Sequence, residues 1–284
     1  MDSCYLCSGK EFIKRRGKVR DNPSLEVYEC MNCGLVSLSD FSHISSDFYE
    51  NSGMFSGNKV DIEESLALSA KDDERRFNYL NQLIINKNIL DFGCGFGGFL
   101  RMAKKIAKDV KGVEPNYDTV KSFFLSEKLT VFQNINEVIG HYDVITLFHV
   151  LEHLENPRLI LSELALKLRT EGVIIIEVPN ADDALLKVYE NEAFSKFTYW
   201  SCHLFLYNNS TLSQLAKQVG LKVKFIKQIQ RYPLSNHLYW LSKGKPGGHE
   251  KWHFIDSVKL NNEYENALAS IGCCDTIIAC FEKG

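Results

Sequence analysis

Four cysteines near the N-terminus form two pairs with the spacing of metal ligands. Cys4 and Cys7 make up one C-x-x-C pair, and Cys30 and Cys33 make up a second pair after 22 intervening residues. Each pair can supply two thiolates, so the two pairs together can complete the tetrahedral shell of a structural zinc ion. A segment of about 30 residues is too short to bury four cysteines in a core of its own. The spacing therefore predicts a zinc ribbon over residues 1–40, in which the metal has a structural role.

The other five cysteines lack this spacing. Cys273 and Cys274 are adjacent, which does not suit a two-thiolate knuckle, and Cys280 falls within an apolar run. Cys202 follows an aromatic run, and Cys94 lies inside a glycine-rich segment. We expect all five to be packing residues, with Cys94 placed beside a ligand loop.

The glycine-rich segment contains Gly93, Gly95 and Gly98 in a G-x-G-x-x-G arrangement, which is typical of nucleotide-binding loops. Glycines at such a turn allow the backbone to approach a ligand closely at the carboxyl edge of a sheet. A nicotinamide dinucleotide is one candidate, but Asp91 lies just before the turn and would repel its pyrophosphate. A cationic sulfonium ligand with an amino-acid tail tolerates that carboxylate. Glu114, at the end of the next predicted strand, could hold the ribose diol of either nucleotide.

His149, Glu152 and His153 form a third group of chemically capable residues. Their H-x-x-E-H order matches an inverted zinc-protease motif, which must lie within a helix and needs a further ligand downstream. Here the motif begins where a buried strand is predicted to end. Proteolysis is therefore disfavoured.

These residues require a scaffold, and the hydrophobic pattern predicts an α/β one. Apolar runs typical of strands alternate with segments of helical periodicity, as in a doubly wound, mostly parallel sheet with helices on both faces. The predicted fold is Rossmann-like, with a seven-stranded sheet and a small N-terminal zinc ribbon. The predicted sheet strands are 88–92, 110–114, 130–132, 142–148, 173–178, 222–229 and 275–281. The predicted helices are 62–85, 99–107, 117–127, 157–168 and 210–219, and the ribbon strands are 11–14 and 25–29.

Composition and charge exclude several classes of protein. Of the 284 residues, 45% are hydrophobic and 24% are charged, which is typical of a globular chain rather than a disordered, collagen-like or coiled-coil one. No run approaches the roughly 20 apolar residues of a membrane span, and the N-terminus lacks the pattern of a secretory signal. A cytoplasmic, reducing location is therefore expected. A net charge of −3 provides no basic field to attract nucleic acid.

Three regions are expected along the chain. The zinc ribbon is followed by a polar connector with a leading helix over 41–85 and by an α/β domain over 86–284. The connector contains the apolar residues Phe48, Tyr49, Met54 and Phe55. An aromatic insertion over 232–270 is expected to form a loop that serves as a lid over substrate or as an oligomer contact. The loop prediction rests on Gly244, Pro246, Gly247 and Gly248.

Three motifs in register resemble those of class I S-adenosylmethionine-dependent methyltransferases. They are the glycine-rich run 90–97, Glu114 after the second strand, and FHVLEHLENP at 148–157, which is similar to the ubiquinone-type O-methyltransferase branch. The resemblance covers about residues 75–230. It implies S-adenosylmethionine as cofactor, with Glu114 on the ribose hydroxyls, the glycine loop facing the methionine moiety and an adenine contact near Asn134. The implied cofactor residues are Asp91, Gly93, Cys94, Gly95, Gly97, Glu114, Asn134 and Phe148.

The cysteine pairs and the run CGLVSLSDFSHISSDFY at 33–49 resemble a narrower group, the zinc-ribbon methyltransferases found with sugar and surface-polysaccharide pathways. This similarity implies a small polar acceptor, such as a sugar or nucleotide-linked sugar hydroxyl in surface-polysaccharide biosynthesis. Larger members carry a long additional C-terminal domain that acts in sugar C-methylation, and we do not expect 284 residues to hold it. Transfer to oxygen, nitrogen or carbon remains open.

Catalysis is expected to use the histidines. Methyl transfer is an in-line displacement, so the enzyme aligns the substrates and removes one proton, a task that suits a histidine at neutral pH. His153 is the first candidate base and His203 is the second, and a capping role for Glu152 and His153 is the alternative. In some ubiquinone-type relatives these positions hold a divalent ion. The resemblance implies such an ion near Glu152 and His153, with His149 standing where a carboxylate is expected.

Two other functions remain open. Some RNA base methyltransferases also carry an N-terminal zinc module, although a basic run on a short ribbon is more often a solvated surface. A non-catalytic module that docks a partner through its ribbon is disfavoured by the intact glycine loop and Glu114. The basic run comprises Lys10, Lys14, Arg15, Arg16, Lys18 and Arg20.

Overall fold

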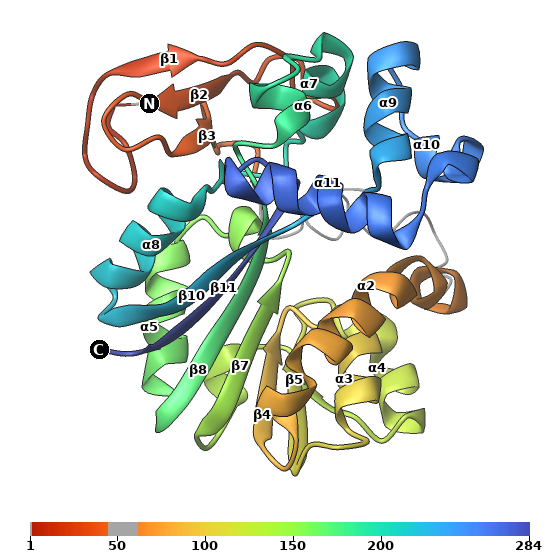
Figure 1. The fold of residues 1–284 in the computed structure, drawn as a ribbon. Coiled ribbons are helices and arrows are strands. Elements are labelled where there is room, and N and C mark those ends of the chain that lie inside the picture. Colours follow the sequence, from red (N-terminus) through yellow and green to blue (C-terminus); the bar gives the residue numbers. More distant parts are fainter. Residues whose placement is uncertain (1, 45–61) are drawn as a thin grey trace.

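The computed structural model describes residues 2–44 and 62–284 and is built around a seven-stranded sheet (Figure 1). In sheet order, the strands are β10 (Leu221–Ile229), β11 (Thr276–Lys283), β8 (Leu168–Pro179), β7 (Tyr142–Phe148), β4 (Asn88–Phe92), β5 (Asp109–Val113) and β6 (Thr130–Phe132). The run from β8 to β6 is parallel throughout, whereas β11 is antiparallel to both of its neighbours. The predicted α/β fold with a mostly parallel sheet is confirmed.

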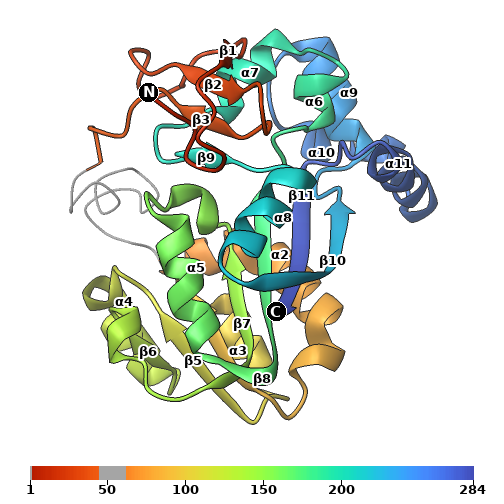
Figure 2. The ribbon, with the colours of Figure 1, turned by 90° about the vertical axis from the view of Figure 1, so that its left-hand side faces the viewer.

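Helices cover both faces of this sheet (Figure 1, Figure 2). One face carries α2 (Ile62–Ile84), α3 (Gly98–Ala103) and α4 (Tyr117–Ser126), and the other carries α5 (Pro157–Leu166) and α8 (Asn209–Gln218). Successive residues of a strand point to opposite faces, so a central strand must be apolar on both. In β8, Ile174 and Ile176 belong to the core under α5 and α8, whereas Ile175 belongs to the core under α2 and α3. This explains why the run around residue 175 is continuously apolar.

The aromatic insertion is largely helical, so the predicted loop is wrong for most of its length. It contains α9 (Leu234–Lys243), α10 (Gly248–Lys251), the 3₁₀ turn η3 (His253–Ile255) and α11 (Val258–Ser270). The glycines form only the short turn between α9 and α10, where Gly244 ends one helix at a φ of 63°. The insertion lies with α6 (Ala184–Lys187) and α7 (Glu192–Thr198) at the end of the sheet where β8 ends (Figure 1).

The N-terminal segment forms three short strands, β1 (Phe12–Lys14), β2 (Val27–Cys30) and β3 (Val36–Leu38). A fourth strand from the α/β domain, β9 (Phe205–Leu206), pairs antiparallel with β3 and completes a four-stranded sheet. The ribbon also shares one continuous apolar core with the larger sheet. The sequence pattern did not predict β3 or β9, because runs of two or three residues show no periodicity.

Other boundaries differ by a few residues from the prediction. β8 begins at Leu168 rather than 173, because Leu168 already pairs with Tyr142 of β7. α3 ends at Ala103 rather than 107, and two 3₁₀ turns, η1 (Ile135–Glu137) and η2 (Leu151–His153), complete the elements. The apolar connector residues Phe48, Tyr49, Met54 and Phe55 lie outside the described residues. Among the helices of the two described ranges, none combines the length and apolar character that crossing a membrane requires.

Candidate active site

The glycine loop leaves β4 in a conformation that only glycines allow easily. Gly93 has a φ of 74°, and a Cβ atom at this position would lie 2.4 Å from Cγ2 of Val150. The amides of Gly93 and Cys94 donate to the carbonyl oxygen of Val113 at the end of β5 over 2.8 and 3.0 Å. Gly95 has a φ of 52°, and a Cβ atom there would face open space. The loop is therefore anchored to the sheet at one end and offers uncovered backbone at the other.

Glu114 lies directly after β5 and is almost fully buried. Its Oε2 accepts a hydrogen bond from the Gly95 amide over 2.8 Å, and its Oε1 accepts one from the Asn116 amide over 3.1 Å. Burial raises the pKa of this carboxyl group. Each carboxylate oxygen can accept a second hydrogen bond, so Glu114 can receive ligand hydroxyls while the loop holds it in place.

Asp91 and Cys94 occupy the two ends of the turn. Asp91 is buried, accepts a hydrogen bond from Oγ1 of Thr146 over 2.7 Å, and has a pKa that burial raises to about 7. A cationic ligand beside it would favour its ionised form. Sγ of Cys94 packs toward the sheet, into the space that a side chain at Gly112 of β5 would need. Cys94 therefore supports the loop through its packing, and the loop backbone faces outward.

Asn134 and Phe148 have other partners in this structure. Asn134 caps η1. Its Oδ1 accepts a hydrogen bond from the Asn136 amide over 3.0 Å, and the Asn134 amide donates to Oε1 of Glu137 over 3.0 Å. The ring of Phe148 stacks edge-on against Phe99 and is covered by the Arg76 guanidinium at 4.7 Å. Gly97 starts α3 as its left-handed N-terminal cap.

A buried ionic network, which sequence reasoning missed, lies at the carboxyl end of β8. Glu177 is fully buried, and its two oxygens accept hydrogen bonds from Nη1 and Nη2 of Arg75, each over 2.9 Å. Arg76 donates to the same carboxylate from Nε and Nη2 over 3.0 and 2.8 Å. Burial would raise the pKa of Glu177, but His149, Arg76 and Arg75 hold it well below its usual value. The signal in the sequence was a single carboxylate in the otherwise apolar run 173–178.

His149 lies inside this network, between two carboxylates. Its Nδ1 is 3.2 Å from Oε1 of Glu152, and its Nε2 is 3.3 Å from Oε1 of Glu177. Burial and Arg231 lower the pKa of His149, but the bonds to Glu152 and Glu177 outweigh them and raise it. The two carboxylates therefore favour the protonated form of His149. This geometry suits a positioning role better than that of a base.

His153 and His203 lie together on the other side of Glu152. Their ring centroids are 4.9 Å apart, and Nδ1 of His153 donates to the carbonyl oxygen of Cys202 over 2.7 Å. Burial lowers the pKa of both histidines, that of His203 to about 3, so both imidazoles are neutral at physiological pH. Of the two, His203 lines the neighbouring cavity.

We call this cavity the acceptor cavity. It has a volume of about 330 Å³ and lies where β8, β10 and β11 meet, since Pro179, Arg231 and Thr276 line it. Helices α7 and α9 of the covering layer supply Phe194, Phe197 and Trp240 to its wall. A volume of this size accommodates a small molecule. Further lining residues include Arg20, Trp200, Tyr232, His237, His249 and Asp275.

The four N-terminal cysteines are brought together as the spacing predicts. Sγ of Cys4 is 3.6 Å from Sγ of Cys33, and Sγ of Cys7 is 3.5 Å from Sγ of Cys30. Tetrahedral zinc thiolates have sulfur–sulfur separations of about 3.8 Å, given Zn–S bonds of about 2.3 Å. The four sulfur atoms all lie within 4.8 Å of one another, so they fit a structural zinc ion.

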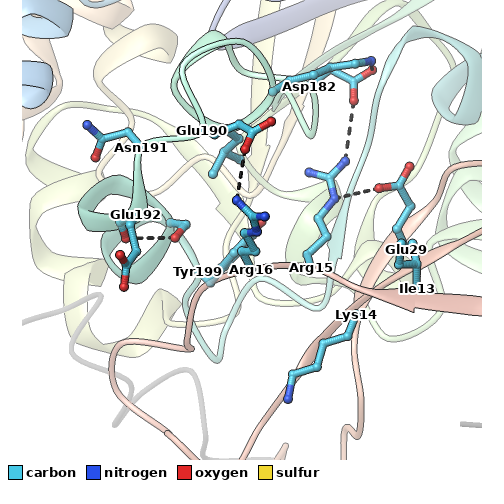
Figure 3. A pocket seen from close by; sticks show the side chains of 13 residues that line it. Ile13, Lys14, Arg15, Arg16, Glu29, Asp182, Glu190, Asn191, Glu192 and Tyr199 are labelled. Carbon is cyan, nitrogen blue, oxygen red and sulfur yellow. Dashed lines mark hydrogen bonds and ion pairs between the residues drawn. The ribbon is translucent and has the colours of Figure 1, made fainter.

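A second cavity, of about 690 Å³, separates the ribbon from α6 and α7 (Figure 3). Arg15 lies between Glu29 and Asp182, with nitrogen–oxygen distances of 2.9 and 3.6 Å, and Arg16 reaches Glu190 over 3.0 Å. Much of the predicted basic run is thus paired with acidic groups of the same chain. The walls carry both signs of charge and present no basic surface of their own.

Comparisons with known proteins agree with this geometry. Residues 64–224 match a family described as methyltransferase domain. The ubiquinone biosynthesis O-methyltransferase of Hydrogenovibrio crunogenus is 24% identical over 229 residues, which cover 73% of this chain and 90% of that protein. The mitochondrial ubiquinone biosynthesis O-methyltransferase of Candida albicans is 30% identical over 139 residues, or 44% of this chain and 39% of that protein.

Two solved structures share the fold. A mitomycin 7-O-methyltransferase superposes with a TM-score of 0.50 at 11% identity, covering 76% of this chain and 54% of that one. A methyltransferase solved in complex with a Haloferax volcanii methyltransferase activator gives a TM-score of 0.51 at 11% identity. The match covers 78% of this chain and 97% of that one. Because the family match spans more than half of the residues, this chain belongs to the methyltransferase domain family and is a class I S-adenosylmethionine-dependent methyltransferase.

Proposed function

We propose that this enzyme methylates a hydroxyl of a sugar or nucleotide-linked sugar in surface-polysaccharide biosynthesis, in the cytoplasm. The observation that carries the proposal is the acceptor cavity, where aromatic rings, histidines and two arginines line a volume of about 330 Å³. Sugars present apolar C–H faces and polar edges, so they suit walls that combine rings with hydrogen-bonding groups. Nine free cysteines also suit a reducing compartment.

The glycine loop fits the cofactor by charge and by space. S-adenosylmethionine, when bound, supplies a methyl group on a positively charged sulfur. Asp91 and Glu114 place carboxylates beside the uncovered backbone of Gly95, where they favour a cationic ligand and its ribose hydroxyls.

The acceptor hydroxyl is positioned at the histidine pair. His203 contacts the acceptor from the cavity wall, and His153 packs behind it. His203 and His153 would accept the proton of the acceptor hydroxyl, and S-adenosylmethionine, when bound, would supply the methyl group. Residues of α9 and α10 line the cavity, which supports the lid interpretation of residues 232–270.

Arg20 favours the nucleotide-linked form of the acceptor. This ribbon residue lines the acceptor cavity, and its guanidinium lies over the ring of Trp200 at 4.3 Å. Arg231 lines the same cavity. The guanidinium of Arg231 is already paired with Asp72. Arg20 is therefore the guanidinium that we assign to the phosphate groups of the acceptor.

A second candidate acceptor is a phenol, because curated relatives are named ubiquinone biosynthesis O-methyltransferases. An RNA acceptor is disfavoured, since Arg15 and Arg16 of the basic run are already paired within the chain.

The test is an acceptor screen read by mass spectrometry. The full chain is incubated with S-adenosylmethionine and, separately, with nucleotide-linked sugars, free sugars, phenols and short RNAs. The proposal predicts a gain of one methylene group on a sugar-containing acceptor. A gain on phenols alone, or on RNA alone, would show that the acceptor class is wrong while leaving the methyltransferase assignment intact.

A further inference from the structure

His153, Cys202 and His203 form a second cluster of metal-ligating side chains, separate from the ribbon. One nitrogen of each ring and Sγ of Cys202 all lie within 4.8 Å of one another. Two of the three ligands come from the chain after α7 and the third comes from η2, so the fold brings them together across about 50 residues of sequence.

The donor set does not fit the divalent ion implied near Glu152 and His153. A hard ion of that kind takes several oxygen ligands. Glu152 is the carboxylate next to His153 in the chain, and its Oε1 already lies 3.2 Å from Nδ1 of His149. The ligand atoms that gather around His153 are sulfur and nitrogen instead.

We propose that His153, Cys202 and His203 bind a zinc-class transition metal ion through two imidazoles and one thiolate. Three protein ligands with an open fourth position are typical of catalytic rather than structural zinc sites. Zinc–ligand bonds of about 2.0–2.3 Å require the three atoms to approach one another to about 3.5 Å, a movement within the reach of side-chain rotation.

The surroundings of the cluster support this assignment. Nδ1 of His153 donates to the carbonyl oxygen of Cys202, which places the lone pair of a neutral ring on Nε2. Metal-binding histidines are commonly fixed in this way by a backbone carbonyl. Glu152 is fully buried beside the cluster and its Oε2 has no hydrogen-bond partner among residues 2–44 and 62–284, so a carboxyl oxygen lies close to the proposed cation.

The open position would face the acceptor cavity, because His203 lines that cavity. With the metal bound, the two imidazoles would act as ligands in place of the base role given above, and the zinc ion would polarise an acceptor hydroxyl so that its proton could leave to solvent. This catalytic role rests on the proposed function, whereas the binding of the metal does not.

The metal content of the full chain tests the site without any acceptor. The protein is equilibrated with zinc, desalted into metal-free buffer and measured by mass spectrometry of the metal. We expect about two zinc ions per chain, one of them in the ribbon, and about one in the Cys202→Ala and His203→Ala variants. The matched control is Cys280→Ala, which removes a buried thiol from β11 and should keep both ions.

Circular dichroism identifies any variant that has failed to fold, and the wild-type stoichiometry does not depend on the variants. About one zinc ion in the wild type would overturn the site, as would about two in the folded Cys202→Ala variant. If both ions are present but no acceptor is methylated, the metal site stands and the proposed function fails.

Discussion

Nε of Arg231 donates to Oδ1 of Asp72 over 3.0 Å, and this pair joins the wall of the acceptor cavity to helix α2 beside the glycine loop. Nη1 of Arg231 also lies 3.1 Å from Nε2 of His149, and this nitrogen lies 3.3 Å from Oε1 of Glu177. A continuous set of charged side chains therefore links helix α2 and the end of β8 to the wall of the acceptor cavity.

Glu177→Gln should lower the free energy of unfolding by about 3–5 kcal/mol, because it leaves Arg75, Arg76 and His149 without a buried counter-charge. Urea unfolding followed by circular dichroism measures the effect. The control is Glu171→Gln, at an exposed position of β8, which should change stability by less than about 0.5 kcal/mol. Equal small effects at both positions would mean that the network does not hold the site together.

The Asp183→Asn variant should become more stable relative to the wild type as the pH rises. Burial and, after it, the charge of Asp275 raise the pKa of Asp183 to about 8 from an ordinary value of 3.8. The folded wild type must therefore keep a proton that the unfolded chain releases, so it loses stability between about pH 4 and pH 8. Asparagine carries no such proton and can still cap α6 through its side-chain oxygen, as Asp183 does at the Leu185 amide.

Unfolding free energies of the wild type and the Asp183→Asn variant, measured from pH 5 to pH 8, check this. Between these two pH values, the unfolding free energy of the variant should rise relative to that of the wild type by at least about 1.4 kcal/mol, which is the equivalent of one pKa unit. The same substitution at Asp109, which is exposed, controls for general effects of pH. A difference that does not change with pH would contradict the assigned state of Asp183.

Arg20→Met should raise the KM for a nucleotide-linked sugar by about tenfold and leave the KM for the free sugar nearly unchanged, because Arg20 is proposed to meet the phosphates. Arg16→Met is the matched control, since Arg16 belongs to the same ribbon and pairs with Glu190 away from the acceptor cavity. Steady-state kinetics with both acceptors separate the outcomes. Equal losses on both acceptors would assign Arg20 a purely structural role.

The sequence predicted the sheet well because its signals are local. The run around residue 175 is apolar on both faces, and the glycines after β4 require a turn, so both could be recognised without the structure. The cysteine pairs were equally informative, since their spacing alone fixes the geometry of two knuckles. The strands β3 and β9 are too short to carry a pattern, and their pairing joins residues about 170 positions apart.

The site was less predictable because its decisive contacts are long-range. Nothing local indicates that Arg76 bonds Glu177, or that Arg20 of the ribbon reaches the wall formed by Trp240. His153 and His203 were both recognised as candidates, but only the structure places His203 on the cavity. Glycines in the insertion suggested a loop, whereas apolar residues such as Trp240 pack against the chain and stabilise a helix.

The central claim is that S-adenosylmethionine binds at the glycine loop through Glu114, and isothermal titration tests it most directly. The wild type should bind about one equivalent, and Glu114→Ala should weaken binding by at least about tenfold, because the variant loses both the ribose contact and the bond to the Gly95 amide. Glu127→Ala, which removes a carboxylate paired with Arg101 at the end of α4, should bind like the wild type. Unchanged affinity in Glu114→Ala would contradict the account, because the cofactor would then bind elsewhere.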